Sequence, residues 1–231
     1  MPTSVPAMPL EHLGDRFVAR VLLSVEPDEL RPALGHDLHA LLRARCPVQT
    51  LPTEPTTGLT VHEAWWRILA ADQLEMLLQV GATVPQTPAL LAEFVRVVLE
   101  IAEHVGHPVP EALLIDTPPL LGGSPSSPPD STGLPRLVAD LAIEDAEHGH
   151  PSAALFASQQ GFAEAVRPWD CVVLQDEGPS VIVDCAAGPG ALAHLVATFA
   201  EGMGSVGAAR LRCRLFATPP AGGDLGAARP S

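Results

Sequence analysis

Two short clusters of acidic and histidine side chains have the composition of metal ligands. Glu103 and His107 are four residues apart, and Asp145 and His148 are three residues apart. On a helix, both spacings place the two side chains on one face. Carboxylate and imidazole groups bind divalent transition metals, so two such pairs on facing helices would build a metal-dependent helical-bundle enzyme.

The position of these clusters also has a structural interpretation. Both lie where a helix is expected to end, and histidine is favoured there by the helix dipole and is usually solvated. His36 and His39 form a third pair that is equally generic. No Cys-x-x-Cys spacing occurs among the four cysteines, Cys46, Cys171, Cys185 and Cys213. We therefore expect no metal and no cofactor, and we assign no catalytic residue.

A row of three arginines is the most concentrated feature of the chain. Arg210, Arg212 and Arg214 alternate with apolar residues, which predicts a strand with the three guanidinium groups on one side, about 7 Å apart. Such a row is suited to binding an anion, such as a phosphate, an acidic partner or single-stranded nucleic acid. No aromatic residue interleaves with the arginines, so a base-stacking surface is poorly supported.

The same row has a purely structural interpretation. The arginines would then pair with carboxylates on neighbouring strands, or they would charge an exposed sheet edge and so discourage aggregation. The carboxylates available for such pairing in this part of the chain are Asp170, Asp176 and Asp184.

The adjacent pair Trp65 and Trp66 is the second candidate for partner binding. On the helix expected there, neighbouring side chains diverge by about 100°, so both cannot face one core. One tryptophan is expected to anchor the helical bundle and the other to lie at an interface, because exposed tryptophan often marks a binding hot spot.

The residues that the chain lacks exclude several chemistries. It contains no Lys, no Tyr and no Asn, which fits a GC-rich bacterial coding sequence. The chain consequently has no P-loop lysine, no lysine that could form a Schiff base and no tyrosine that could act as a general acid. A Gly-x-Ser-x-Gly nucleophile elbow is also absent. These absences favour a non-enzymatic protein.

Charge and hydropathy limit the partners. The net charge is −14, from 13 Arg against 27 Asp plus Glu, and an acidic excess of this size repels nucleic acid and anionic membranes. The first arginine is Arg16 and residues 1–10 have no apolar stretch, so we expect no secretory signal. No segment has the length and hydropathy of a membrane span. The cysteine pattern is typical of reduced thiols in the cytoplasm.

The first half of the chain predicts a helical domain over residues 1–116. Apolar periodicity, proline and glycine boundaries and a capping box at Thr60 and Glu63 indicate about four helices. These helices are expected at 10–23, 27–46, 60–80 and 88–105. Their apolar stripes would pack together as a small bundle.

The second half predicts a small mixed module over residues 136–218. It follows a Pro/Gly/Ser-rich linker or mobile loop at 117–135 and precedes a disordered tail at 219–231. The expected elements are helices at 136–148 and 152–166, a hairpin of 171–176 with 180–185, a helix at 189–201 and a strand at 210–216. We find no internal repeat. The predicted fold class is α+β.

We therefore expect a cytoplasmic protein that binds another protein as an adaptor, regulator or chaperone-like partner, with a homodimer as one option for its assembly. The alternatives are the metal-dependent helical-bundle enzyme and anion or nucleic-acid binding through the arginine row. The residues expected to contact a partner or anion are Arg210, Arg212, Arg214, Trp65 and Trp66.

Overall fold

One antiparallel sheet dominates the structure, which is a computed structural model. It describes residues 14–24, 59–70, 73–82, 85–104, 110–122, 132–144, 153–203 and 208–217. The strands are β1 (Arg16–Ser24), β2 (Leu59–Ala70), β3 (Gln73–Ala82), β4 (Ala112–Thr117), β5 (Arg136–Glu144), β6 (Val172–Gln175), β7 (Val181–Ala186) and β8 (Ala209–Ala217). They form a single sheet in the order β2-β3-β1-β4-β8-β5-β7-β6. Every pair of neighbours is antiparallel.

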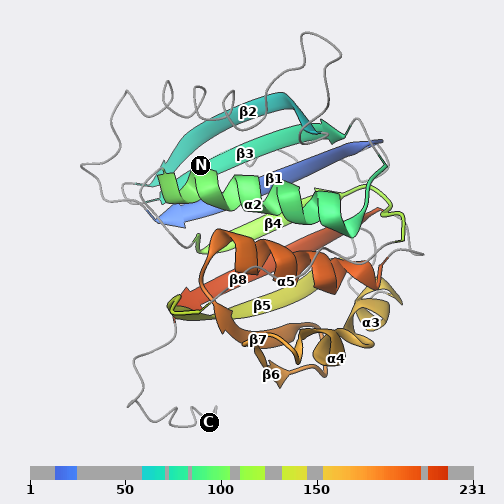
Figure 1. Cartoon of the computed structure of the whole chain (residues 1–231). Coiled ribbons are helices and arrows are strands. Elements are labelled where there is room, and N and C mark those ends of the chain that lie inside the picture. Colours follow the sequence, from blue (N-terminus) through green and yellow to red (C-terminus); the bar gives the residue numbers. More distant parts are fainter. Residues whose placement is uncertain are drawn as a thin grey trace, which may run out of the picture.

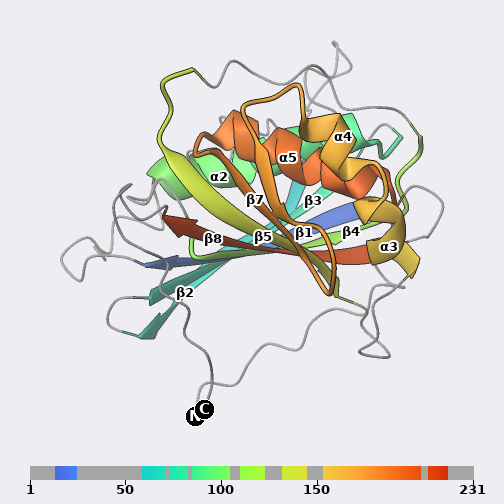
Figure 2. The ribbon, with the colours of Figure 1, turned by 90° about the horizontal axis from the view of Figure 1, so that it is seen from below.

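Two helices lie side by side on one face of this sheet. They are α2 (Pro88–His104) and α5 (Pro189–Glu201), and Figures 1 and 2 show both on the same side. The short helices α3 (Ala153–Gln159) and α4 (Phe162–Val166) lie beside α5 near the β6 end. Gly161 separates them with a φ of 84°, a left-handed conformation that glycine adopts without strain. We call the sheet face opposite α2 and α5 the second face.

The core lies between the helices and the sheet. Alternate residues of each strand point into it, such as Phe17, Ala19, Val21 and Leu23 of β1, which are all 0% exposed. Phe17 stacks on Phe94 of α2 with ring centroids 5.4 Å apart. This contact joins the first strand to the helix layer.

The two halves of the chain repeat one topology. Residues 16–117 give the order β1-β2-β3-α2-β4, and residues 136–217 give β5-β6-β7-α5-β8 with α3 and α4 inserted. Their strands occupy the sheet in mirrored order, with β4 and β8 paired at the centre. We found no internal repeat in the sequence, because the repetition lies in the connectivity and not in the residue pattern.

The predicted N-terminal four-helix bundle is wrong. The helix expected at 10–23 is strand β1, and the helix expected at 60–80 is the hairpin of β2 and β3. The helix expected at 27–46 lies outside the described residues. Within the part of the first half that the structure describes, only the helix expected at 88–105 is found, as α2. The hydroxyl of Thr87 accepts a hydrogen bond from the Leu90 amide at its start.

The predictions for the second half fared better. The hairpin, the helix at 189–201 and the arginine-bearing strand are confirmed as β6–β7, α5 and β8. The helix at 152–166 is divided into α3 and α4 by Gly161. The helix expected at 136–148 is wrong, since residues 136–144 form the central strand β5.

The mid-chain segment and the tail are less fully described. Residues 118–122 and 132–135 of the expected linker form no helix or strand, and the rest of that segment and the tail at 219–231 lie outside the described residues. Pairing of β4 with β8 places both halves in one sheet. Among the helices that the structure describes, none has the length and apolar character needed to cross a membrane.

Candidate functional site

Arg210 is held by a buried carboxylate on the second face. Its Nε lies 2.5 Å from Oδ1 of Asp116 and its Nη2 lies 2.9 Å from Oδ2, so the pair is bidentate. The two side chains are 12% and 4% exposed. Asp116 is the penultimate residue of β4, the strand next to β8, and its position faces Arg210 in the register. Arg210 is therefore part of the fold.

The other two arginines differ from each other. Arg212 is partly buried and interacts with another group of the protein, whereas Arg214 is exposed and stands between Ala112 of β4 and Asp140 of β5 in the register. Anion binding by this row stays a prediction, with Arg214 as its exposed member.

The structural interpretation of the row is corrected in two respects. The acid that pairs with Arg210 is Asp116, which lies 94 residues away and was not among those considered. In addition, β8 lies between β4 and β5 in the interior of the sheet, so the row does not charge a sheet edge. Asp184 instead pairs with Arg136.

Three of the four expected metal ligands lie outside the described residues. Glu103 is exposed on α2, and His107, Asp145 and His148 lie outside the described residues. Within the described ranges, no group of three or more His, Cys, Asp or Glu side chains is placed to hold a metal ion. The helical bundle on which the two pairs were expected to face each other is replaced by a sheet.

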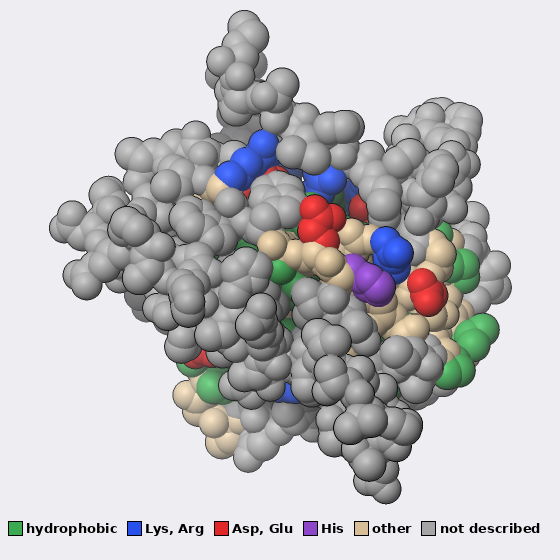
Figure 3. All heavy atoms as spheres, turned by 90° about the horizontal axis from the view of Figure 1, so that it is seen from above, with side chains coloured by type: hydrophobic (Ala, Val, Ile, Leu, Met, Phe, Trp, Pro, Cys, Tyr) green, Lys and Arg blue, Asp and Glu red, His purple; other side chains and the backbone are tan. Residues whose placement is uncertain are grey.

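Trp65 and Trp66 belong to strand β2 at one edge of the sheet. In the register, Trp65 faces Leu77 and Trp66 faces Met76 of β3. The reasoning from helical divergence is thus corrected, and partner binding by these residues stays a prediction. Three neighbouring side chains of β2 that the structure describes are polar. Arg67 pairs with Glu75, and His62 and Glu63 are exposed. Figure 3 shows acidic, basic and histidine side chains together on this side of the molecule.

The opposite edge of the sheet, strand β6, exposes apolar side chains. Strand β6 pairs with β7, and no other described strand pairs with its outer side. Its Val172 and Leu174 are 54% and 56% exposed, while Val173 between them packs against the core. Val172 and Leu174 therefore project from the second face.

Further apolar side chains lie across the sheet from β6, beyond the carboxylate of Asp184. In the register, Val172 faces Asp184, Asp184 faces Val138, and Val138 faces Phe216 of β8. Phe216 is 52% exposed, and the span from Val172 to Phe216 is about 14 Å at ordinary strand spacing. We call Val172, Leu174, Val138 and Phe216 the apolar edge. Sequence reasoning missed it, although the expected hairpin contained its central strand.

Acidic groups flank the apolar edge. Asp170 precedes β6, Asp176 and Glu177 follow it, and all three are exposed. Arg136 lies 2.7 Å from carboxylate oxygens of both Asp170 and Asp184. Around β6 there are thus four carboxylates for one guanidinium. The local potential at this edge is negative, like that of the whole chain.

The three cysteines among the described residues are not activated nucleophiles. Burial raises the pKa of the Cys171 thiol to about 11 and that of Cys185 to about 12, and it also raises the pKa of Cys213. Each is consequently protonated at neutral pH, and thiolate is the reactive form. Cys185 and Cys213 are buried, as expected, whereas Cys171 is only half-buried.

His194 is a buried histidine on α5. It is 4% exposed, and its ring centroid lies 4.4 Å from that of Trp169. Desolvation by burial lowers its pKa. The neutral imidazole is thus packed against the ring of Trp169.

We expect His194 to make the fold less stable in acid. Because its pKa is lower in the folded state, its contribution is complete above the unfolded value of about 6.5 and is lost as the pH falls below that value. The slope is at most about 1.4 kcal/mol per pH unit. Urea unfolding at pH 7 and pH 5 measures the loss, and His194→Leu should reduce it. An equal loss in both proteins would contradict this role.

The chain was also compared with known proteins. No protein family model matches it, and no curated protein is similar to it.

Proposed function

We propose that this chain is a non-enzymatic, cytoplasmic protein that binds an extended segment of another protein along the outer side of β6. It would thereby act as an adaptor, a regulator or a chaperone-like partner. The observation that carries the proposal is an outer strand with two exposed apolar side chains at one end of an eight-stranded sheet.

The outer side of β6, which pairs with no described strand, favours a partner in extended conformation. An edge strand presents N–H and C=O groups to any chain that approaches in extended conformation. Strand addition uses these groups for affinity and uses alternate side chains for specificity. Val172 and Leu174 are exposed side chains two residues apart on β6, with Leu174 at a register shift against β7. Phe216 lies on the same face, beyond Asp184 and Val138.

Charge supports a basic partner over a second copy of this chain. Antiparallel pairing of β6 with β6 of another copy would bring Asp170 near Asp176 and Glu177, which are like charges. A segment with apolar alternate residues and arginines at its ends would instead meet opposite charges. We therefore assign the outer side of β6 to such a basic segment.

A peptide titration tests this proposal. The probe is a fluorescent peptide of alternating valine and threonine with an arginine at each end, and binding is followed by anisotropy. We expect the affinity to fall at least tenfold when alternate backbone nitrogens of the peptide are methylated, because methylation removes hydrogen-bond donors without changing the side chains. A peptide with glutamate at both ends should bind more weakly.

Two protein variants test whether the peptide binds at β6. Leu174→Asp should weaken the complex, whereas Phe156→Ser should not, because Phe156 is equally apolar and 71% exposed but lies on α3. The proposal is contradicted if no peptide of the series binds, or if methylation leaves the affinity unchanged. A dimer in light scattering that Leu174→Asp dissociates would assign this edge to a second copy and contradict the basic partner.

A further inference from the structure

Cys171 directly precedes β6, and Cys185 follows Asp184 on β7, so both lie at the open end of the hairpin. The register pairs Val172 with Asp184, so one step outward along the same antiparallel pair brings Cys171 opposite Cys185. Directly opposite residues in antiparallel strands have Cα atoms about 4.5–5.5 Å apart. Disulfides span Cα separations of about 4.4–6.8 Å.

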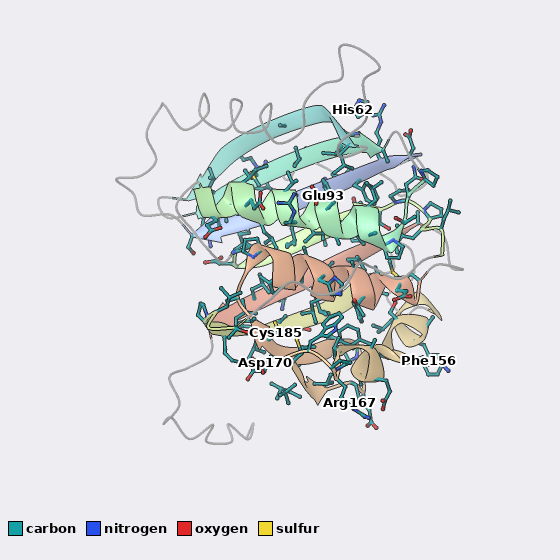
Figure 4. The ribbon with its side chains drawn as sticks, viewed as in Figure 1. His62, Glu93, Phe156, Arg167, Asp170 and Cys185 are labelled. Atoms are coloured by element: carbon teal, nitrogen blue, oxygen red, sulfur yellow. The ribbon has the colours of Figure 1, made fainter. Side chains whose placement is uncertain are left out.

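Arg136 provides independent evidence that the two backbones are close. Its Nη1 donates to the carbonyl oxygen of Asp170 at 2.9 Å, and its Nη2 donates to the carbonyl oxygen of Asp184 at 3.1 Å. These carbonyl groups are bonded directly to the nitrogens of Cys171 and Cys185. One planar guanidinium therefore holds both cysteines' backbones side by side. Figure 4 shows the labelled Asp170 and Cys185 close together.

Both thiols lie on the helix-covered side of the sheet. Cys185 is 2% exposed within the core, and Cys171 packs against the same core cluster while remaining half-buried. Val172, the next residue along the strand, projects from the second face, as alternation along the chain requires. The two Cβ atoms thus lie on the same side of one strand pair.

We propose that Cys171 and Cys185 form a redox-sensitive pair that closes to a disulfide by exchange with a low-molecular-weight disulfide of the glutathione class. The half-buried Cys171 thiolate attacks one sulfur of that disulfide and releases one thiol, leaving a mixed disulfide on Cys171. The Cys185 thiolate then attacks the Cys171 sulfur and releases the second thiol. Two protein thiols are oxidised, and one small disulfide is reduced to two thiols.

The chemical environment sets the rate of this exchange. Because burial raises the pKa of both thiols to about 11 and about 12, the thiolate fraction is small at neutral pH. We expect slow closure at pH 7.5 and closure about ten times faster at pH 8.5, since the thiolate fraction grows tenfold per pH unit below the pKa. The bond would join edge strand β6 covalently to β7.

Peptide mass mapping of the full chain tests the pair. The protein is equilibrated with oxidised glutathione, its remaining thiols are alkylated in denaturant, and it is cut with trypsin. Because Arg167 precedes a proline, residues 137–210 form one peptide that holds both Cys171 and Cys185, while Cys46 and Cys213 fall on other peptides. We expect this peptide to be unalkylated and lighter by about 2 Da, the mass of two hydrogens.

Two serine variants complete the design. Cys171→Ser should leave Cys185 open to alkylation, whereas Cys213→Ser should close the disulfide as the wild type does, because Cys213 lies on β8. The proposal is overturned if residues 137–210 remain alkylated at equilibrium or carry only a glutathione adduct. Disulfide-linked peptides that join Cys171 to Cys46 or Cys213 would overturn it equally.

Discussion

Replacing Asp116 with alanine is expected to lower the free energy of unfolding by about 3–5 kcal/mol, because the largely buried guanidinium of Arg210 then loses its carboxylate. Asp116 is 3% exposed and its bond to Arg210 is bidentate. Urea unfolding followed by circular dichroism measures the change. The loss should exceed that for any exposed charge on the same face.

Arg214 supplies the matched control for this prediction. It stands four residues from Arg210 on the same side of β8 but is exposed, so Arg214→Met should change stability by less than about 0.5 kcal/mol. The double variant Asp116→Leu with Arg210→Met should recover most of the loss, since a buried ion pair is often replaceable by apolar residues. If Asp116→Ala were as mild as Arg214→Met, Arg210 would not depend on this carboxylate.

The second large effect is expected at Phe94. Phe94→Ala should destabilise the protein by about 3–5 kcal/mol, because it leaves a cavity between α2 and β1 where the ring stacks on Phe17. Phe156→Ala on α3 is the control, since Phe156 is 71% exposed and its removal leaves no cavity. Thermal or urea unfolding of both variants gives the comparison. Similar losses for the two would contradict the placement of Phe94 in the core.

The alternation of β3 was visible in the sequence but was outweighed by helix propensity. Leu74, Met76, Leu78 and Val80 recur every second residue and all face the core. Leu77 interrupts the polar positions between them, and leucine, methionine, glutamate and glutamine all favour helices in isolation. Pairing with β1 and β2 decides the outcome, and that pairing depends on residues far away in the chain.

The prediction for strand β5 was wrong for the same reason. Its residues Leu137, Ala139, Leu141 and Ile143 point into the core, yet the stretch is rich in alanine and leucine and reads equally well as a helix. Strand β8 was predicted correctly because arginine and apolar residues alternate there without interruption. Alternation of apolar residues therefore identified β8, where the intervening residues are arginines as far as Arg214, but it did not identify β5.

The candidate site was harder to predict than the elements. The pairing of Asp116 with Arg210 joins residues from the two halves of the chain, and nothing local in either segment indicates it. The apolar edge likewise depends on the strand order, which places β6 at the end of the sheet. The hairpin pattern at 171–185 predicted strands β6 and β7 but did not indicate which other strands lie beside them in the sheet. Knowledge of the sheet order was therefore needed to separate the exposed Val172 from the buried Val183.

Hydrogen–deuterium exchange tests the binding role of β6 most directly. The full chain is measured with and without the arginine-flanked valine–threonine peptide, and the backbone amides are compared strand by strand. Protection should increase in β6, at Val172–Gln175, and remain unchanged in β2 at the other edge of the sheet. Protection confined to β2 or to the arginine strand β8, with none in β6, would contradict strand addition at this edge.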